Sequence, residues 1–170
     1  MKHFRFLLAL FLSGLLCLLS TTTFAASAPK EDYFYIQRAT FGVFKKLGHT
    51  NTYQLTLRGI DPYVVYFSDR PVRQAGLLTT EQFYQQWNSQ QSNSFNKDAP
   101  NVGFFGVRVH RLFKGKDIND AITLSEPQYN LARNRITYTA TILTTNAASL
   151  PKKFKVKNIV LFFDPYCPMC

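Results

Sequence analysis

The stretch that decides the fold runs over residues 63–103 and combines a strand, a polar corner and a helix. It opens as Tyr63-Val-Val-Tyr-Phe-Ser-Asp-Arg-Pro-Val-Arg-Gln-Ala-Gly76. The unbroken apolar run over residues 63–67 predicts a strand that is buried on both faces. Pro71 ends this strand, because proline cannot donate a hydrogen bond to a sheet ladder.

A helix start follows the corner, at Leu78-Thr-Thr-Glu-Gln-Phe83. Thr79 can cap the helix, and Gln82, three residues later, completes a capping box. Phe83 and Trp87 are four residues apart, which places them on one face of the helix. We interpret this segment as a packing helix that carries no chemistry.

The rest of the chain reads as short strands separated by turns. Residues 53–58 alternate apolar and polar side chains, which is typical of a strand with one wet face. The turn at Gly59-Ile-Asp-Pro62 predicts that this strand pairs as a hairpin with the strand over residues 63–67. Further strands are expected over residues 33–44, 102–113, 121–124 (ended by Glu126-Pro127) and 136–143. Lys153, Lys155 and Lys157 alternate with apolar residues, and a last buried strand is expected over residues 159–163.

About seven or eight short strands and one helix predict a mainly β fold. The spacing suits an antiparallel β-sandwich or a partly open barrel with one short helix. The sequence contains no internal repeat, phosphate-binding loop or dinucleotide fingerprint.

The first 25 residues predict a secretory signal peptide. Lys2 and Arg5 form a basic start, residues 6–19 are almost all apolar, and Thr23-Phe-Ala25 offers small residues before a cleavage point. The apolar run is shorter than the roughly 18 residues that span a membrane. We therefore expect a signal peptide over residues 1–25 and one exported β-rich domain, in the periplasm or outside the cell, over residues 26–170.

The chain is basic, and removal of Lys2 and Arg5 with the signal lowers its formal charge from +10 to +8. Such a surplus favours anionic surfaces, such as lipid headgroups or polysaccharide. A solvated basic surface without a partner is the plainer interpretation. We expect no nucleic-acid partner, because an exported protein seldom meets one and no nucleic-acid motif is present. We also expect no transmembrane segment in the mature chain.

The polar corner provides the first candidate binding site, formed by Asp69, Arg70 and Arg73. A carboxylate between two guanidinium groups could hold an anionic ligand or stay ionised for acid–base work. Alternatively, Ser68 and Asp69 hydrogen-bond the turn backbone and Asp69 pairs with an arginine. The sequence nominates no nucleophile or second acid for a catalytic set, so we predict no catalytic residue and no cofactor.

The C-terminus provides the second candidate, the pair Cys167 and Cys170. A strand that leads into Cys-x-x-Cys is typical of a thioredoxin active site, but that fold needs a following helix and an alternation of strands and helices. An inert disulfide, a redox role and a soft-metal site that also uses Met169 all remain open. The histidines His49 and His110 do not fall in a metal-ligand spacing.

The order of several short motifs resembles one family of small exported bacterial domains. These motifs are Phe67-Ser-Asp-Arg-Pro-x-Arg73, then Phe83-x-x-x-Trp87, then Pro100-Asn101. The resemblance spans residues 53–138, and it implies a whole domain of a recurring kind. It implies no activity, because the family is uncharacterised.

The sequence leads to three hypotheses about function. The first is a non-catalytic exported β-domain that binds a partner in the cell envelope, either an envelope protein or an anionic envelope component. The second is a thiol-redox or soft-metal-binding protein that acts through Cys167 and Cys170. The third, an enzyme centred on Asp69, has the least support.

Overall fold

The computed structural model describes residues 33–69, 73–89, 94–109, 115–144 and 150–164. The predicted signal peptide, residues 1–25, and the end of the predicted Cys-x-x-Cys tail, residues 165–170, lie outside the described residues. The strands are β1 (Tyr33–Lys46), β2 (Thr52–Ile60), β3 (Tyr63–Ser68), β4 (Ala75–Thr79), β5 (Asn101–Arg108), β6 (Lys116–Asn130), β7 (Arg135–Ile142) and β8 (Lys153–Asp164). The helix α2 (Thr80–Trp87) follows β4, and the short 3-10 helix η2 (Leu131–Arg133) follows β6. No helix in this described part is long and apolar enough to cross a membrane.

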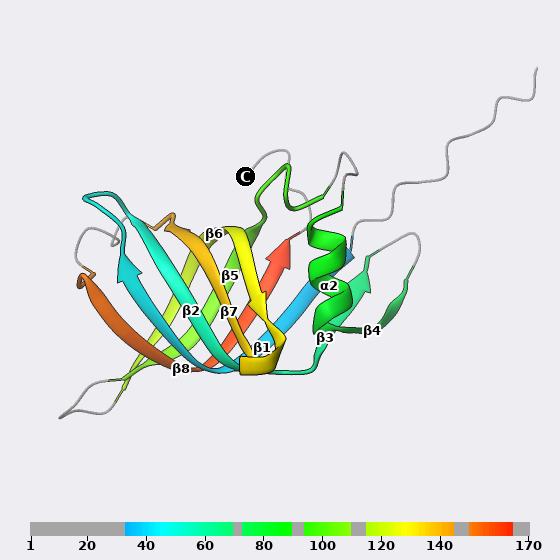
Figure 1. Ribbon diagram of the computed structural model, residues 1–170, viewed down its shortest axis with the longest axis horizontal. Helices are drawn as coiled ribbons and strands as arrows, with labels where there is room; N and C mark the ends of the chain where they lie inside the picture. The colour runs from blue at the N-terminus through cyan, green and yellow to red at the C-terminus, as the bar shows by residue number, and fades with distance from the viewer. Residues whose placement is uncertain (1–32, 70–72, 90–93, 110–114, 145–149, 165–170) are drawn as a thin grey trace, which may run out of the picture. The chain divides into compact units, whose positions relative to one another are not determined.

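All eight strands form one antiparallel sheet in the order β2-β7-β6-β5-β8-β1-β3-β4. Since β2 also pairs with β1, the sheet curls on itself (Figure 1). The core lies inside the curl, and every second residue of β7 contributes to it: Ile136, Tyr138, Ala140 and Ile142 are all buried. The predicted mainly β, antiparallel fold with one short helix is confirmed.

The long strand β1 pairs along one edge with two strands, first β3 and then β2. β3 pairs with residues 33–36 of β1, and β2 pairs with residues 39–46. The hairpin predicted between β2 and β3 is therefore wrong, because these strands lie one after the other along β1. Between them, the Asp61 backbone N–H donates to the Arg38 carbonyl over 3.1 Å and holds the connection against β1.

β3 is buried on one face only, so the prediction that both faces are buried is wrong. Val64 is fully buried, whereas Tyr63 is 53% exposed and Val65 is 40% exposed. β3 and β4 extend the sheet beyond the curl, and within the described residues no other element packs on their outer face. The apolar outer residues of β3 are therefore left at the surface.

β6 is longer than the strand predicted over residues 121–124. Its pairing with β7 shifts register between Ser125 and Gln128, and Glu126 adopts a positive φ of 53°. A bulge leaves an extra residue out of the ladder. Pro127 is thus accommodated where its missing N–H costs no ladder hydrogen bond, and β6 continues to Asn130.

The start of α2 is formed as the sequence predicts. The Thr79 side chain accepts from the Gln82 N–H over 3.1 Å, and the Gln82 side chain accepts from the Thr79 N–H over 2.9 Å. The helix buries Phe83, Tyr84 and Trp87.

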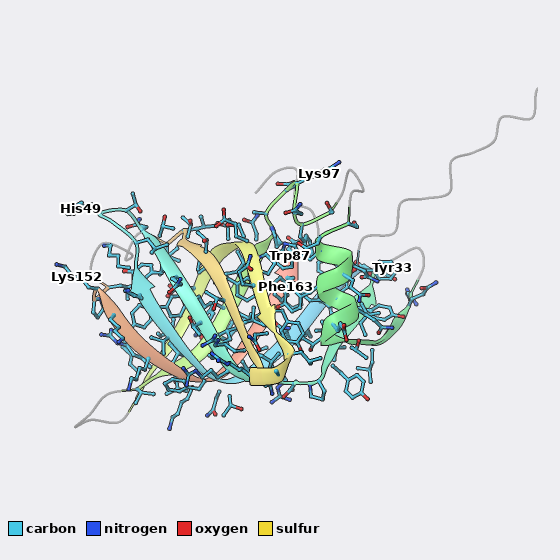
Figure 2. The ribbon with its side chains drawn as sticks, in the orientation of Figure 1. Tyr33, His49, Trp87, Lys97, Lys152 and Phe163 are labelled. Atoms are coloured by element: carbon cyan, nitrogen blue, oxygen red, sulfur yellow. The ribbon has the colours of Figure 1, made fainter. Side chains whose placement is uncertain are left out.

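The aromatic face of α2 packs against four strands that meet at one end of the curl. Phe83 contacts Tyr35 of β1, with ring centroids 5.1 Å apart. Tyr84 stacks on Tyr129 of β6, and Trp87 packs on Tyr138 of β7. Trp87 also meets Phe163 of β8 edge to face at 5.9 Å (Figure 2). The helix therefore fills the interior that these strands leave open.

Candidate functional site

The polar corner that the sequence nominated connects β3 to β4. Ser68 closes it: its backbone N–H donates to the Gln74 carbonyl over 2.8 Å, and its Oγ accepts from the Gln74 N–H over 3.1 Å. Asp69 and Arg73 are exposed, and Arg70 lies outside the described residues. Ser68 thus has the structural role expected of it, and binding by Asp69, Arg70 and Arg73 stays a prediction.

The histidine and thiol candidates do not form a site in the described part of the chain. His49 is exposed in the turn between β1 and β2. His110, Cys167 and Cys170 lie outside the described residues. Among the residues that the structure describes, no three metal-ligating side chains come together.

A buried polar cluster lies where α2 meets the inner face of the sheet. Gln37 of β1 is fully buried, and its Oε1 accepts from the Tyr84 hydroxyl over 3.0 Å and from the Tyr138 hydroxyl over 3.1 Å. The two hydroxyls also contact each other. Across the described residues, Gln37 Nε2 and the neighbouring Trp87 Nε1 find no hydrogen-bond partner.

The chemistry of this cluster is structural. Burial raises the pKa of Tyr84 well above its usual value of 10, so the hydroxyl stays neutral and donates. The cluster ties α2 to β1 and β7 and offers no acid–base pair. Gln37 could have been noticed in the sequence, because it occupies an inward position between the inward Tyr35 and Ala39.

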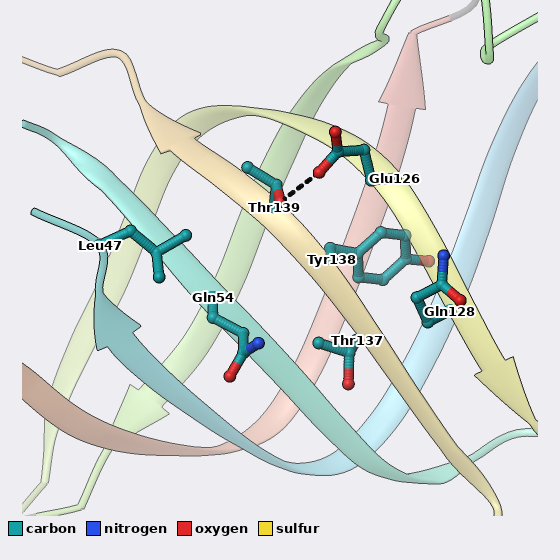
Figure 3. Close-up of a pocket in the computed structure, with 7 residues that line it drawn as sticks. All are labelled: Leu47, Gln54, Glu126, Gln128, Thr137, Tyr138 and Thr139. Carbon is teal, nitrogen blue, oxygen red and sulfur yellow. Dashed lines mark hydrogen bonds between the residues drawn. The ribbon is translucent and has the colours of Figure 1, made fainter.

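One pocket opens on the outside of β2, β6 and β7 and measures about 390 Å³ (Figure 3). It lies beside the β6 bulge, and its lining includes the amides of Gln54 and Gln128 and the hydroxyls of Thr137 and Thr139. Its one carboxylate, Glu126, accepts a 2.8 Å hydrogen bond from the Thr139 hydroxyl. The pocket can form hydrogen bonds but holds no pair of groups for acid–base catalysis.

A second pocket, of about 530 Å³, lies between the β2–β3 connection, the start of α2 and η2. Its carboxylates are Asp61 and Glu81, and Tyr129 forms part of the wall. Burial, and then the charge of Glu81, raise the pKa of Tyr129. The Thr80 hydroxyl donates to the Asp61 carbonyl over 2.7 Å, so Thr80 holds the β2–β3 connection against the start of α2.

A basic ladder covers one half of the outer face of β1, β2 and β8. Residues that pair directly across two strands point to the same side of a sheet. The register therefore groups Lys45 with Lys153 and brings Lys157 and Arg58 to either side of Phe41. The ladder consists of Lys45, Arg58, Lys153, Lys155 and Lys157, which are all exposed. None of them forms an ion pair within the described part of the chain.

An aromatic patch covers the other half of this outer face. Phe34 of β1 stacks on Phe67 of β3 at 5.3 Å and on Phe162 of β8 at 5.7 Å. The patch continues through Phe105 on β5, which is 46% exposed. It consists of Phe34, Phe67, Phe105 and Phe162, with Val65 and Leu77 beside them on β3 and β4.

Gly103 lets the patch extend over β5. A Cβ on this residue would lie 3.1 Å from the Phe105 ring and 3.7 Å from the Phe162 Cβ. The Phe105 ring therefore lies over the bare backbone of Gly103 and next to Phe162. Any larger residue at position 103 would have to push the ring away.

Sequence reasoning missed both halves of this outer face as a site. The alternation of Lys153, Lys155 and Lys157 was visible and correctly predicted the strand. Their neighbours on β1 and β2 depend on long-range pairing, which a local pattern does not report. The aromatic patch was missed because the residues of β3 were expected to be buried on both faces.

No family model matches this chain, and no curated protein and no solved structure matches it either. The resemblance to exported bacterial domains, carried by Phe67-Ser-Asp-Arg-Pro-x-Arg73 and the motifs after it, therefore stays a prediction.

Proposed function

We propose that this protein is an exported, non-catalytic β-domain that binds an anionic component of the cell envelope. The observation that carries the proposal is the basic ladder on the outer face of β1, β2 and β8. Within the described residues, these three strands contain no acidic side chain before Asp164, the last residue of β8. No carboxylate of these strands therefore neutralises the positive charge of the ladder.

The spacing of the ladder suits a partner that carries many charges. Alternate residues of one strand lie about 7 Å apart, and neighbouring strands lie about 5 Å apart. Lysine presents a flexible point charge rather than the fixed fork of arginine. Four lysines and one arginine at these intervals favour a surface or polymer with repeated anionic groups over a single small ligand.

The same surface supports a binding role rather than catalysis. Its described groups are ammonium and guanidinium cations, hydroxyls, amides and apolar side chains, and no histidine, cysteine or carboxylate lies among them before Asp164. General acid–base catalysis needs groups whose pKa lies near the working pH. A surface rich in lysine and arginine attracts anions instead.

Two double charge reversals test the proposal. Lys155→Glu with Lys157→Glu changes the ladder, and Lys116→Glu with Arg133→Glu makes the same change in net charge on β6 and η2. Each lysine near an anionic surface contributes about 1 kcal/mol, so the loss of two lysines and their replacement by glutamate should weaken binding to isolated cell envelopes by at least about 30-fold. The control should bind within about threefold of the parent. Equal losses in the two variants would reduce the effect to net charge and contradict the proposal.

A further inference from the structure

We infer that the anionic component is a lipid bilayer surface, with the aromatic patch contacting the membrane interface beside the basic ladder. This inference rests on the proposed function and names the partner of the same face. The patch and the ladder adjoin on β1 and β8. Arg38 pairs with Val160 at the edge of the patch, and Phe41 pairs with Lys157 at the edge of the ladder.

The patch is exposed although folding gives no reason for it. Leu77 is 62% exposed, Phe105 46% and Val65 40%. Soluble proteins rarely leave a contiguous apolar surface of this kind open to water unless it binds something. A soluble polyanion would engage the ladder but would offer nothing apolar to cover the patch.

Apolar side chains also lie within the ladder. Phe41 and Val43 are partly exposed between Lys45 and Lys157 on the paired strands β1 and β8. Cations interleaved with aromatic and aliphatic groups are typical of protein surfaces that lie in the membrane interface. There the apolar groups enter the headgroup boundary and the cations meet anionic headgroups.

The shape of the face favours a bilayer over a folded protein partner. The core fills the inside of the curled sheet, so the outer face is the convex one, and Figure 1 shows β1 and β8 following that curve side by side. No residue of the ladder or the patch, and none of β1 or β8, lines either of the two pockets described above. A fluid lipid surface can adapt to convex side chains, whereas a rigid partner needs a complementary hollow.

Binding to vesicles and to a soluble polyanion tests separately whether the protein binds anions and whether it binds a lipid bilayer. The purified protein is tested against phosphatidylcholine vesicles, vesicles of phosphatidylcholine and phosphatidylglycerol in equal parts, and dextran sulfate as a soluble polyanion. The patch variant is Leu77→Ser with Phe105→Ser. The control is Leu143→Ser, at a residue that lies just after β7, outside the patch, and is 51% exposed. Circular dichroism establishes that each variant is folded.

The parent should bind the anionic vesicles and not the phosphatidylcholine vesicles. The patch variant should lose roughly tenfold or more on anionic vesicles, because two apolar side chains no longer enter the interface, and should bind dextran sulfate unchanged. Lys155→Glu with Lys157→Glu should lose binding to both anionic partners. Leu143→Ser should behave as the parent.

Each contrary result identifies which step fails. A patch variant that binds anionic vesicles as the parent does, while the lysine variant does not, overturns the bilayer inference and leaves the proposed function standing. A parent that binds dextran sulfate but neither vesicle also overturns the inference and leaves a soluble polyanion as the partner. A lysine variant that binds both anionic partners as tightly as the parent overturns the proposed function itself.

A direct reporter of insertion completes the test. Phe105→Trp places an exposed indole in the patch, whereas the native Trp87 is 1% exposed in the core. Emission from this indole should be quenched by brominated lipid in anionic vesicles and should shift to shorter wavelength. An indole that stays unquenched while the protein is bound would overturn contact of the patch with the membrane.

Discussion

The inner and outer faces of β1 and β8 carry the same kind of side chain but differ in what covers it. On the inner face Phe44 and Phe154 stack at 4.6 Å, and Phe163 packs against α2. On the outer face Phe34 and Phe162 also stack, yet no described element packs over them. Aromatic content alone does not distinguish core from surface: the inner rings stabilise the fold, and we propose that the outer rings bind a partner.

Two neighbouring phenylalanines of β8 test this comparison with the largest expected effect. Phe163→Ala should lower the free energy of unfolding by about 3–5 kcal/mol, because it opens a cavity against Phe83 and Trp87. Phe162→Ala should cost about 1 kcal/mol, because its ring is already partly in water. Urea unfolding of both variants measures the difference. Equal costs would show that the outer face is also part of the core.

The buried polar cluster sharpens the comparison with two glutamines. Gln37→Ala should lower the free energy of unfolding by about 2–3 kcal/mol, because the Tyr84 and Tyr138 hydroxyls lose their buried acceptor. Gln54→Ala, on the exposed face of β2, should change it by about 0.5 kcal/mol or less. Urea unfolding is again the measurement, and a small cost at Gln37 would contradict a structural role for the cluster.

The fold class and the start of α2 could be predicted from the sequence because both depend on local patterns. The alternation of apolar residues from Ile136 onward predicted β7, and the pair Thr79 and Gln82 predicted the helix cap. The sharing of one β1 edge by β2 and β3 could not be predicted, since pairing partners far apart in sequence leave no local signal. Pro127 misled for a similar reason, because only the register with β7 reveals the bulge.

The candidate site was less predictable than the fold. Asp69, Arg70 and Arg73 were nominated because a carboxylate close to two arginines stands out in a linear sequence. The basic ladder gathers Lys45, Arg58 and the β8 lysines from three strands, and the aromatic patch gathers residues from β1, β3, β4, β5 and β8. These residues become neighbours only when the strands pair and the sheet curls. The composition therefore shows an excess of positive charge but not where on the surface it lies.

Alkaline pH should reveal the burial of Tyr84 in the inner cluster. The pKa of Tyr84 is raised by burial, so below pH 10 the hydroxyl is neutral in both folded and unfolded chains. Above pH 10 the unfolded chain ionises while folded Tyr84 does not, and stability falls by up to about 1.4 kcal/mol per pH unit from this residue. Unfolding of the parent and Tyr84→Phe across this range should give a steeper loss for the parent. Parallel curves would contradict the burial effect.

The polar corner should give the smallest effects on stability. Ser68→Ala removes a hydrogen bond at a residue that is 8% exposed, and it should cost about 1 kcal/mol. Asp69→Ala, at an exposed position, should cost less than about 1 kcal/mol in urea unfolding. A larger loss of stability at Asp69 than at Ser68 would show that the carboxylate, and not the Ser68 hydroxyl, holds the corner together. Lost envelope binding with unchanged stability would give Asp69 the binding role that the sequence suggested.

Lysine footprinting tests most directly whether the outer face of β1, β2 and β8 is the binding surface. The protein is acetylated in the presence and absence of isolated cell envelopes, and mass spectrometry reports the modification of each lysine. We predict that Lys155 and Lys157 are protected by the envelopes while Lys116, on β6, reacts as fast as in the free protein. Binding by this outer face would be contradicted if the envelopes protected Lys116 as much as Lys155. It would also be contradicted if Lys155 and Lys157 stayed unprotected in the bound protein.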